Sequence, residues 1–307
     1  MPAVSTAWPD LLDPRFAKVY NNQYKQLPDR IGDFYQTPSA GGAPTPADYR
    51  MSEVNGFGDI PEFTGTVTYQ DTSQGYSSTI TYKEYASGFQ IERKLFDDAL
   101  YAIMDGKPQG LAIAYQRTRQ KHAAQLFNNA FSVDTTWLSH DEGVALCSNS
   151  HTTTQSNAST ATGFDNLMTA ALSAVSLTAA RIQMRGFRGP NGERMTVMPS
   201  DLLAPVDLYD TAYEITESQG KPDTANNNAN VHYGKYAVSD WEYLTSTRNW
   251  FLMDGTMRKQ FVNWVDRTLM EFAMVEDIDT LVGKWRLYAR YGAGFQTWRW
   301  ILGSQVA

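Results

Sequence analysis

The sequence predicts an α+β fold, in which helical and strand segments are segregated along the chain. Three observations support this prediction. Residues 63–83 alternate between apolar and polar side chains with a period of two, as strands with two different faces do. Residues 108–131 carry an uninterrupted helical pattern, and residues 285–302 alternate again. Because no repeated strand–helix–strand pattern is present, a parallel α/β sheet is not expected.

The first fifty residues are predicted to be largely extended, without a core of their own. Seven prolines fall in this stretch, and residues 39–43 form a small-residue patch of Ser, Ala and Gly. One short helix is expected over residues 15–24. A segment of this kind is ordered when it lies across another surface.

The next segment predicts a long polar β-hairpin. Its arms cover residues 63–69 and 76–83, and its turn covers residues 71–75. An isolated two-stranded hairpin is marginally stable in water, so this one is expected to lie on a second copy of the chain. The side chains predicted to make that contact are Phe63, Val67, Tyr69, Tyr76, Ile80 and Tyr82.

A short strand over residues 88–93 is expected to lead into a long helix over residues 108–131. Proline suits the first turn of a helix, so Pro108 is predicted to begin it. The helix would span roughly 36 Å and act as a structural spine. Its apolar stripe is predicted to comprise Leu111, Tyr115, Thr118, His122, Leu126 and Ala130. The residues predicted to face solvent are Arg117, Arg119 and Lys121.

Further along the chain, a second helical stripe is expected over residues 167–177 and a third helix over residues 205–217. A strand is predicted from residue 285, with a bend at residues 292–294. The chain is rich in Tyr, Phe and Trp, which suit both a packed core and a protein interface, and composition does not separate the two.

Charge and cysteine content exclude several functions. The formal net charge is -7, and no run of basic residues occurs, so a general nucleic-acid binder is not expected. A single cysteine rules out a disulfide within the chain. No secretory signal and no apolar run of membrane-spanning length is present, so no membrane partner is expected.

One cysteine–histidine pair resembles a catalytic arrangement. Cys147 and His151 lie four residues apart, which leaves a Cys/His hydrolase open as an alternative. The opposing interpretation is a buried structural cysteine at the end of an apolar step. The histidines lack metal-site spacings, and residues 186–192 lack the Lys and Ser/Thr of a phosphate loop. No catalytic residue, metal or cofactor is therefore predicted.

The order of these segments resembles the major capsid proteins of tailed bacteriophages, which have the Hong Kong 97-like fold, and within them the Mu-like major head subunits. The likeness rests on the sequence and spacing of many segments, none of which is a chemical signature. These segments are residues 56–86, 89–93, 108–131, 143–151, 191–205, 250–254 and 285–303.

The resemblance implies four regions. They are an N-terminal arm over residues 1–55, an extended hairpin over 56–88, a peripheral domain over 89–134 and 262–307, and an axial domain over 135–261. It also implies a subunit that assembles with itself into hexamers and pentamers of an icosahedral shell. The shell would enclose double-stranded DNA without sequence-specific binding.

The same resemblance implies scaffolding, portal and decoration proteins as partners, assembly in the host cytoplasm and a final place in the virion. Many family members begin with a helical scaffolding segment that is removed. Since no such segment is recognised here, the scaffold is expected to be a separate protein, or the sequence is the mature form. A related alternative is the shell protein of an encapsulin-type bacterial compartment, which encloses protein cargo.

Overall fold

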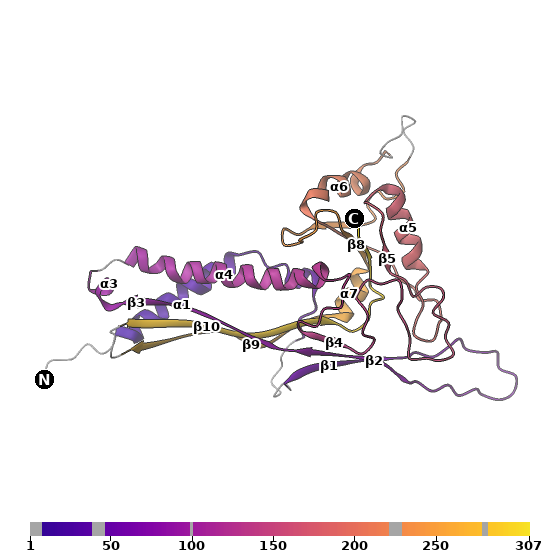
Figure 1. Ribbon diagram of the computed structural model, residues 1–307, viewed down its shortest axis with the longest axis horizontal. Helices are drawn as coiled ribbons and strands as arrows, with labels where there is room; N and C mark the ends of the chain where they lie inside the picture. The colour runs from indigo at the N-terminus through magenta and orange to yellow at the C-terminus, as the bar shows by residue number, and fades with distance from the viewer. Residues whose placement is uncertain (1–7, 39–46, 99–100, 221–228, 278–281) are drawn as a thin grey trace.

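The computed structural model describes residues 8–38, 47–98, 101–220, 229–277 and 282–307. The chain forms an elongated part, which lies horizontally in Figure 1, and an upright part that rises from one end of it. In the elongated part, a layer of helices packs on a sheet. The upright part contains a second sheet. A third, small sheet lies at the junction of the two parts.

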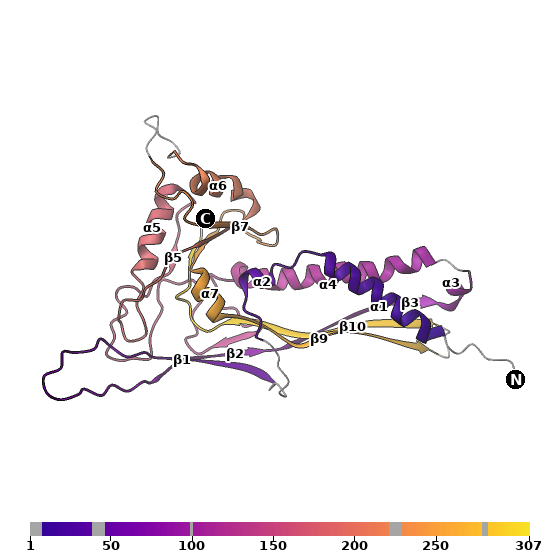
Figure 2. The same cartoon turned by 180° about the vertical axis from the view of Figure 1, so that it is seen from behind.

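The elongated part is built on an antiparallel sheet with the strand order β3-β10-β9. Helices α1 and α4 lie together on one face of this sheet, as Figures 1 and 2 show from opposite sides. The elements are α1 (Trp8–Gln26), α2 (Ile31–Phe34), β3 (Lys83–Glu92), α3 (Arg93–Asp97), α4 (Tyr101–Asn128), β9 (Val262–Asp277) and β10 (Val282–Phe295).

The N-terminal segment packs on its own chain. Helix α1 contacts α4 and β9, and it buries Phe16 and Tyr20 completely. Farther along, the Tyr35 hydroxyl donates a hydrogen bond of 2.6 Å to the carbonyl oxygen of Ala123 on α4. The prediction of a largely extended segment without a core is therefore wrong for residues 8–36. Residues 1–7 and 39–46, also part of the predicted arm, lie outside the described residues.

The spine helix is confirmed, but α4 begins seven residues earlier than predicted, at Tyr101. Pro108 lies inside the helix and removes one backbone hydrogen bond. The first turns are nevertheless held in place, because Met104 is fully buried in a cluster with Phe16 and Trp285. Burial of a large apolar side chain contributes roughly 1.5–3 kcal/mol, which helps to offset the lost bond.

The buried face of α4 is rotated from the predicted stripe. Tyr115 and Ala130 are buried as expected, whereas the expected members Thr118, His122 and Leu126 are half-buried at its edge. The fully covered side chains include Ala112, Arg119, Ala123, Ala124 and Phe127.

Arg119 does not face solvent. Its guanidinium donates hydrogen bonds of 2.9 and 3.1 Å to the carboxylate of Asp266 on β9. The cation lies 5.2 Å from the ring of Trp264. Burial lowers the pKa of Arg119, but Asp266, Tyr115 and Tyr24 together raise it above its ordinary value, so the residue stays charged. The prediction for Arg119 is thus wrong, while Arg117 and Lys121 are exposed as predicted.

The predicted hairpin has a different arrangement. Strand β1 (Asp48–Val54) pairs with β2 (Gln74–Thr81), and β2 also pairs with β4 (Leu138–His140). Residues 55–73 between β1 and β2 contain no strand, so the predicted strand over residues 63–69 is wrong. The predicted short strand over residues 88–93 belongs to the longer β3, which pairs with β10.

Strand β10 runs without a break through residues 292–294, so the predicted bend is wrong. Gly292 and Gly294 in this stretch allow neighbouring strands to approach β10 closely. A Cβ atom on Gly292 would lie 2.8 Å from Ile80 Cγ2, and one on Gly294 would lie 2.7 Å from Leu138 Cδ1. The glycines therefore let the small sheet at the junction pack directly on β10.

The upright part contains a five-stranded sheet with the order β5-β11-β8-β6-β7. Since β11 pairs with β8, the predicted segment 262–307 is divided between two sheets. The predicted stripe over 167–177 is not a continuous helix, because a strand precedes a helix that starts at Ala174. The elements are β5 (Leu167–Met168), α5 (Ala174–Arg185), β6 (Asp201–Ala204), η1 (Val206–Leu208), α6 (Tyr209–Glu217), β7 (Ala237–Asp240), β8 (Trp250–Met253), α7 (Gly255–Phe261) and β11 (Ile301–Ser304).

Most of the aromatic content lies in the core. Every tryptophan side chain that the structure describes is buried, including Trp241, Trp250, Trp264, Trp285 and Trp300. Tryptophan therefore serves packing within the subunit. Over the described part of the chain, no helix has both the length and the apolar content needed to cross a membrane.

Candidate assembly surface

Residues 55–73 form a loop that projects from the junction and extends away from the N-terminus; we call it the projecting loop (Figure 1). Large apolar side chains are exposed on it and on the last residue of β1. They are Val54 at 67%, Phe57 at 64%, Ile60 at 93%, Phe63 at 69%, Val67 at 58% and Tyr69 at 90% exposure. Single exposed apolar residues are ordinary, but a concentration of this kind marks an interaction surface.

The composition of the projecting loop explains why it forms no strand. Pro61 lacks a backbone donor, and Gly65 has a φ of 106°, a conformation that other residues rarely adopt. The Gln70 side chain crosses the loop, where it accepts a hydrogen bond of 2.8 Å from the Gly58 amide and donates one of 3.1 Å to the Asp59 carbonyl. The loop is therefore braced by polar groups and leaves its apolar side chains outside.

The base of the projecting loop is anchored. Asn55 is 1% exposed, and its amide nitrogen donates to the Ser73 carbonyl over 2.9 Å. Its side chain donates to the hydroxyls of Ser73 and Thr154, at 2.9 and 3.2 Å. The Asn191 side chain also donates to the carbonyl of Gly56. A fixed base thus supports an exposed tip.

Beneath the base lies a buried ionic network. Arg299 donates to Glu53 on β1 at 2.6 Å. Nearby, His151 Nδ1 lies 3.1 Å from Glu142, and its Nε2 lies 3.0 Å from the Asn166 side-chain oxygen. These contacts connect the strand that leads into the projecting loop with the segment that precedes β11.

In this network, burial and neighbouring charges of opposite sign shift the pKa values in opposite directions. Burial raises the pKa of Glu53, and Arg299 opposes that effect. Burial also favours a raised pKa for Glu142, but its hydrogen bond and charge interaction with His151 lower the pKa below its ordinary value. Burial lowers the pKa of Arg299, which the two carboxylates oppose. We interpret the network as an anchor for β1.

The six residues predicted to contact a second copy occupy two environments. Phe63, Val67 and Tyr69 are exposed on the projecting loop, whereas Tyr76 is half-buried. Ile80 and Tyr82 are buried in the core of their own chain, at 0% and 5% exposure. These two side chains are already packed within the subunit.

Three residues of the same surface were missed by the sequence analysis, namely Val54, Phe57 and Ile60. For Phe57 and Ile60 the available signal was their position beside glycine and proline, since apolar residues in such a segment have no strand through which to reach a core.

Cys147 and His151 do not form a nucleophile pair. No hydrogen bond joins them among the described residues, and both ring nitrogens of His151 have other partners. Cys147 is buried against Gly303, where burial raises the pKa of its thiol and keeps it protonated. The opposing interpretation of a structural cysteine fits this geometry.

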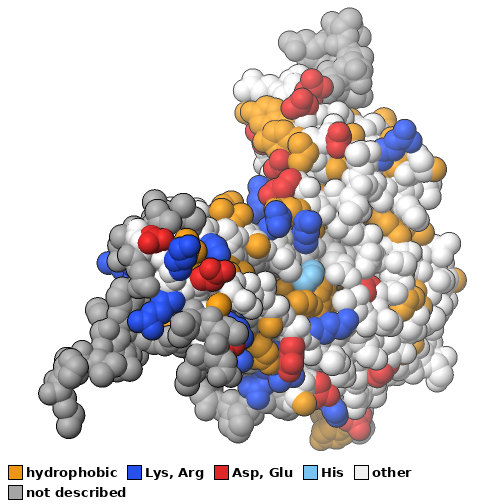
Figure 3. All heavy atoms as spheres, turned by 60° about the vertical axis from the view of Figure 1, so that its left-hand side comes forward, with side chains coloured by type: hydrophobic (Ala, Val, Ile, Leu, Met, Phe, Trp, Pro, Cys, Tyr) orange, Lys and Arg blue, Asp and Glu red, His pale blue; other side chains and the backbone are white. Residues whose placement is uncertain are grey.

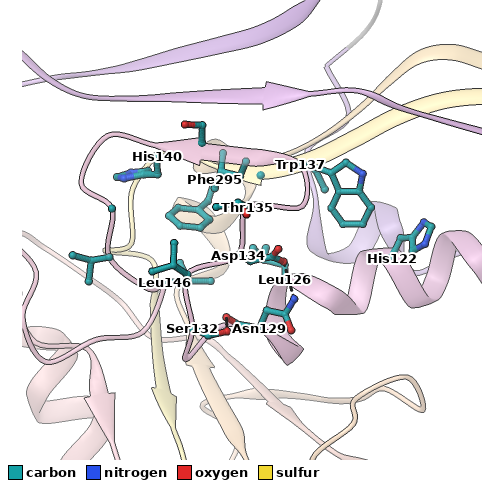
Figure 4. Close-up of a pocket in the computed structure, with 17 residues that line it drawn as sticks. His122, Leu126, Asn129, Ser132, Asp134, Thr135, Trp137, His140, Leu146 and Phe295 are labelled. Carbon is teal, nitrogen blue, oxygen red and sulfur yellow. Dashed lines mark hydrogen bonds between the residues drawn. The ribbon is translucent and has the colours of Figure 1, made fainter.

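A cavity of about 170 Å³ lies between the end of α4 and the segment that leads into β4 (Figure 4). Two titratable side chains in its lining are already hydrogen-bonded. Asp134 accepts hydrogen bonds from the side chains of Gln125 and Asn129, and His140 Nδ1 accepts one from the Glu142 amide. Within the described residues, no cluster of His, Cys, Asp or Glu could hold a metal ion. Both of these titratable side chains are therefore committed to hydrogen bonds within the subunit.

Comparison with known proteins agrees with this picture. A profile of the family described as "phage capsid protein" matches residues 75–303. A search of curated proteins found no match.

Several solved capsid structures have a similar fold. The procapsid of bacteriophage JBD30 has a TM-score of 0.51 and 13% identity, over 98% of this chain and 76% of that one. The mature capsid of bacteriophage PhiM1 has a TM-score of 0.55 and 8% identity, over 92% and 88%. The capsid of a native GTA particle has a TM-score of 0.53 and 11% identity, over 92% and 91%.

The likeness to these structures confirms the predicted fold class, and neither the compartment-shell nor the hydrolase alternative receives support. The family profile extends over well more than half of the chain and includes α4, the five-stranded sheet and β10. The chain therefore belongs to the phage capsid protein family, with the Hong Kong 97-like fold of tailed-phage major capsid proteins.

Proposed function

We propose that copies of this chain assemble into hexamers and pentamers of an icosahedral shell around double-stranded DNA, and that the projecting loop docks on a neighbouring copy. The exposed apolar set between Val54 and Tyr69 carries the proposal. These side chains contribute nothing to the core of their own subunit. Their removal from water by a neighbour would favour association by roughly 25 cal/mol per Å² of apolar surface buried.

The anchored base supports the same role. Since Asn55 and the Glu53–Arg299 pair hold both ends of the loop in place, its apolar residues are presented at a defined position relative to the subunit. Preorganisation of this kind lowers the entropic cost of docking. Rings of identical subunits use contacts in which one patch meets a different patch on the next copy, and a projecting loop suits such a contact.

The elongated and upright parts correspond in this proposal to the peripheral and axial domains. The last strand, β11, then belongs to the axial domain, and α1 belongs to the peripheral domain. The role is structural, without catalysis or cofactor. Scaffolding, portal and decoration proteins are the proposed partners, and assembly takes place in the host cytoplasm. The enclosed DNA is not bound sequence-specifically, in keeping with the net charge of -7.

The test compares two variants of equal loop length. In the first, four apolar residues of the loop (Ile60, Phe63, Val67 and Tyr69) become Ser. In the matched control, the polar residues Thr64, Thr66 and Thr68 become Ser, so the apolar set remains.

The apolar-to-Ser variant should keep its circular dichroism spectrum and melting temperature but form no closed particles by negative-stain microscopy. The threonine-to-Ser control should assemble as the wild-type chain does. Closed shells of normal size from the apolar-to-Ser variant would rule out docking of the loop through these side chains.

A further inference from the structure

Helix α5 in the upright part has an exposed face that is apolar and basic. Val175, Ala179 and Ile182 recur at helical spacing and are exposed, while the opposite face buries Leu177 and Met184. The charged residues of α5 are Arg181 and Arg185, and the helix carries no acidic residue. Among the described residues neither arginine forms an ion pair.

The segment formed by η1 and α6 has the opposite character. It contains four acidic residues and no basic one, and all four are exposed. They are Asp207, Asp210, Glu214 and Glu217. Val206 and Tyr213 of the same segment are also exposed. None of these carboxylates pairs with a described basic residue, and Figure 3 shows acidic and apolar side chains gathered near the top of the upright part, where α6 lies.

The two helices lie toward opposite ends of one sheet. Helix α5 contacts β11 and α6 contacts β6 and β7, in a sheet ordered β5-β11-β8-β6-β7. A subunit in a closed ring meets one neighbour on each side, through two different patches. Faces toward the two ends of the sheet are therefore positioned to serve the two neighbours.

The charges also match in spacing. Arg181 and Arg185 are separated by four residues, as are Asp210 and Glu214, so each pair spans about 6 Å along its helix. Ile182 lies between the arginines, and Tyr213 lies between the carboxylates. Each helix thus carries an exposed apolar residue next in sequence to one of a pair of like charges, and the two helices are complementary in sign.

We propose that α5 of one copy packs against the η1–α6 face of the next copy around the ring, a contact that rests on the assembly proposed above. Val175 and Ile182 contact Val206 and Tyr213. The two arginines of α5 pair with the four carboxylates of η1 and α6, which we call the acidic row. Charge complementarity of this kind fixes register and suppresses wrong pairings.

The projecting loop is a second candidate partner for α5, because it is also both acidic and apolar. The projecting loop contains Asp59, Glu62 and Asp71 beside its exposed apolar residues. We favour α6, because its charges lie on a rigid helix at the spacing of the arginines, whereas the loop has no regular spacing. The experiment below separates the two occupants.

The test is a charge exchange in the full-length chain. Arg185→Glu alone should raise the protein concentration needed for assembly at least about tenfold, because it faces the acidic row of the neighbour. The double change Asp210→Lys and Glu214→Lys should do the same. The chain that combines all three changes should assemble at a lower concentration than either partial variant, because the introduced glutamate then faces the introduced lysines, while Arg181 keeps its original charge.

A control chain combines Arg185→Glu with Asp59→Lys and Glu62→Lys, which alters the total charge equally. It should remain defective. Rescue by this loop exchange and not by the α6 exchange would overturn the proposal and assign α5 to the loop. Normal assembly of Arg185→Glu alone would also overturn the proposed α5 contact. Because the wild-type chain would still form shells in that experiment, the proposed function would be unaffected. A wild-type chain that never assembles would instead count against the proposed function.

Discussion

The projecting loop and the helix layer on the β3-β10-β9 sheet use the same residue types for opposite purposes. In the loop, Phe63 and Tyr69 are exposed, and no core lies beneath them. In the helix layer, Phe127 and Tyr115 are buried, and Arg119 is paired with Asp266 across the interface with the sheet. The comparison shows that an aromatic residue contributes to subunit stability only where its own chain supplies a covering surface. Elsewhere its contribution depends on a neighbour.

The largest effect is expected in the helix layer. Arg119→Ala would leave Asp266 partly buried without its cation, which should lower the free energy of unfolding by about 3–5 kcal/mol. Arg117→Ala, two residues away on the exposed side, should change it by less than about 0.5 kcal/mol. Urea unfolding is best measured in the background of the apolar-to-Ser loop variant, so that assembly does not add to stability. Equal losses for the two variants would contradict the ion-pair interpretation.

A smaller effect concerns pH. Burial, aided by the charge of Lys83, lowers the pKa of His122 to about 4 from its ordinary value of 6.5. Between these values the unfolded chain binds more protons than the folded chain, so stability is fully present above pH 6.5 and decreases as pH falls toward 4. For a half-buried ring the loss should be about 1–2 kcal/mol after allowance for solvent screening.

His122→Asn keeps a group that can bond the Tyr291 hydroxyl, now 2.8 Å from Nδ1, but does not titrate. It should reduce the slope of stability against pH in this window without abolishing it, because burial also lowers the pKa of His140 and His232. The control Lys121→Gln alters an exposed charge one position away and should leave the slope unchanged. An unchanged slope in His122→Asn would show that His122 titrates normally in the folded chain.

The parts of the fold that could be predicted are those whose signal lies in adjacent residues. Helix α4 and strand β10 were found because helical or period-two spacing continues over many positions. Burial of Arg119 could not be predicted, because its partner Asp266 lies 147 residues away. Helix α1 was only partly anticipated, since its order depends on contacts with α4 and β9.

The candidate surface was found in the right segment but with the wrong local structure. Alternation over residues 63–69 resembles a strand, yet a strand needs a partner, and Pro61 and Gly65 interrupt any ladder here. Ile80 and Tyr82 belong to the same alternating pattern but are covered by β10 and its surroundings. Period-two spacing shows that a segment has two faces, and only tertiary contacts decide which face is covered.

A very small change in stability is expected at Phe63. This position therefore gives the sharpest test of the difference between the projecting loop and the packed core. Phe63→Ala should alter the free energy of unfolding by less than about 0.5 kcal/mol, because the ring is exposed and contacts no core. Ile80→Ala, at a position of the same alternating pattern, should cost about 2–5 kcal/mol, because Ile80 is fully buried against Gly292 and Gly294. In assembly the order should reverse when each variant is compared at a temperature well below its own melting transition. Phe63→Ala should then raise the concentration needed to form particles, and Ile80→Ala should not. A large stability loss at Phe63 would mean that the loop folds back on its own subunit, and the division between the two regions would no longer hold.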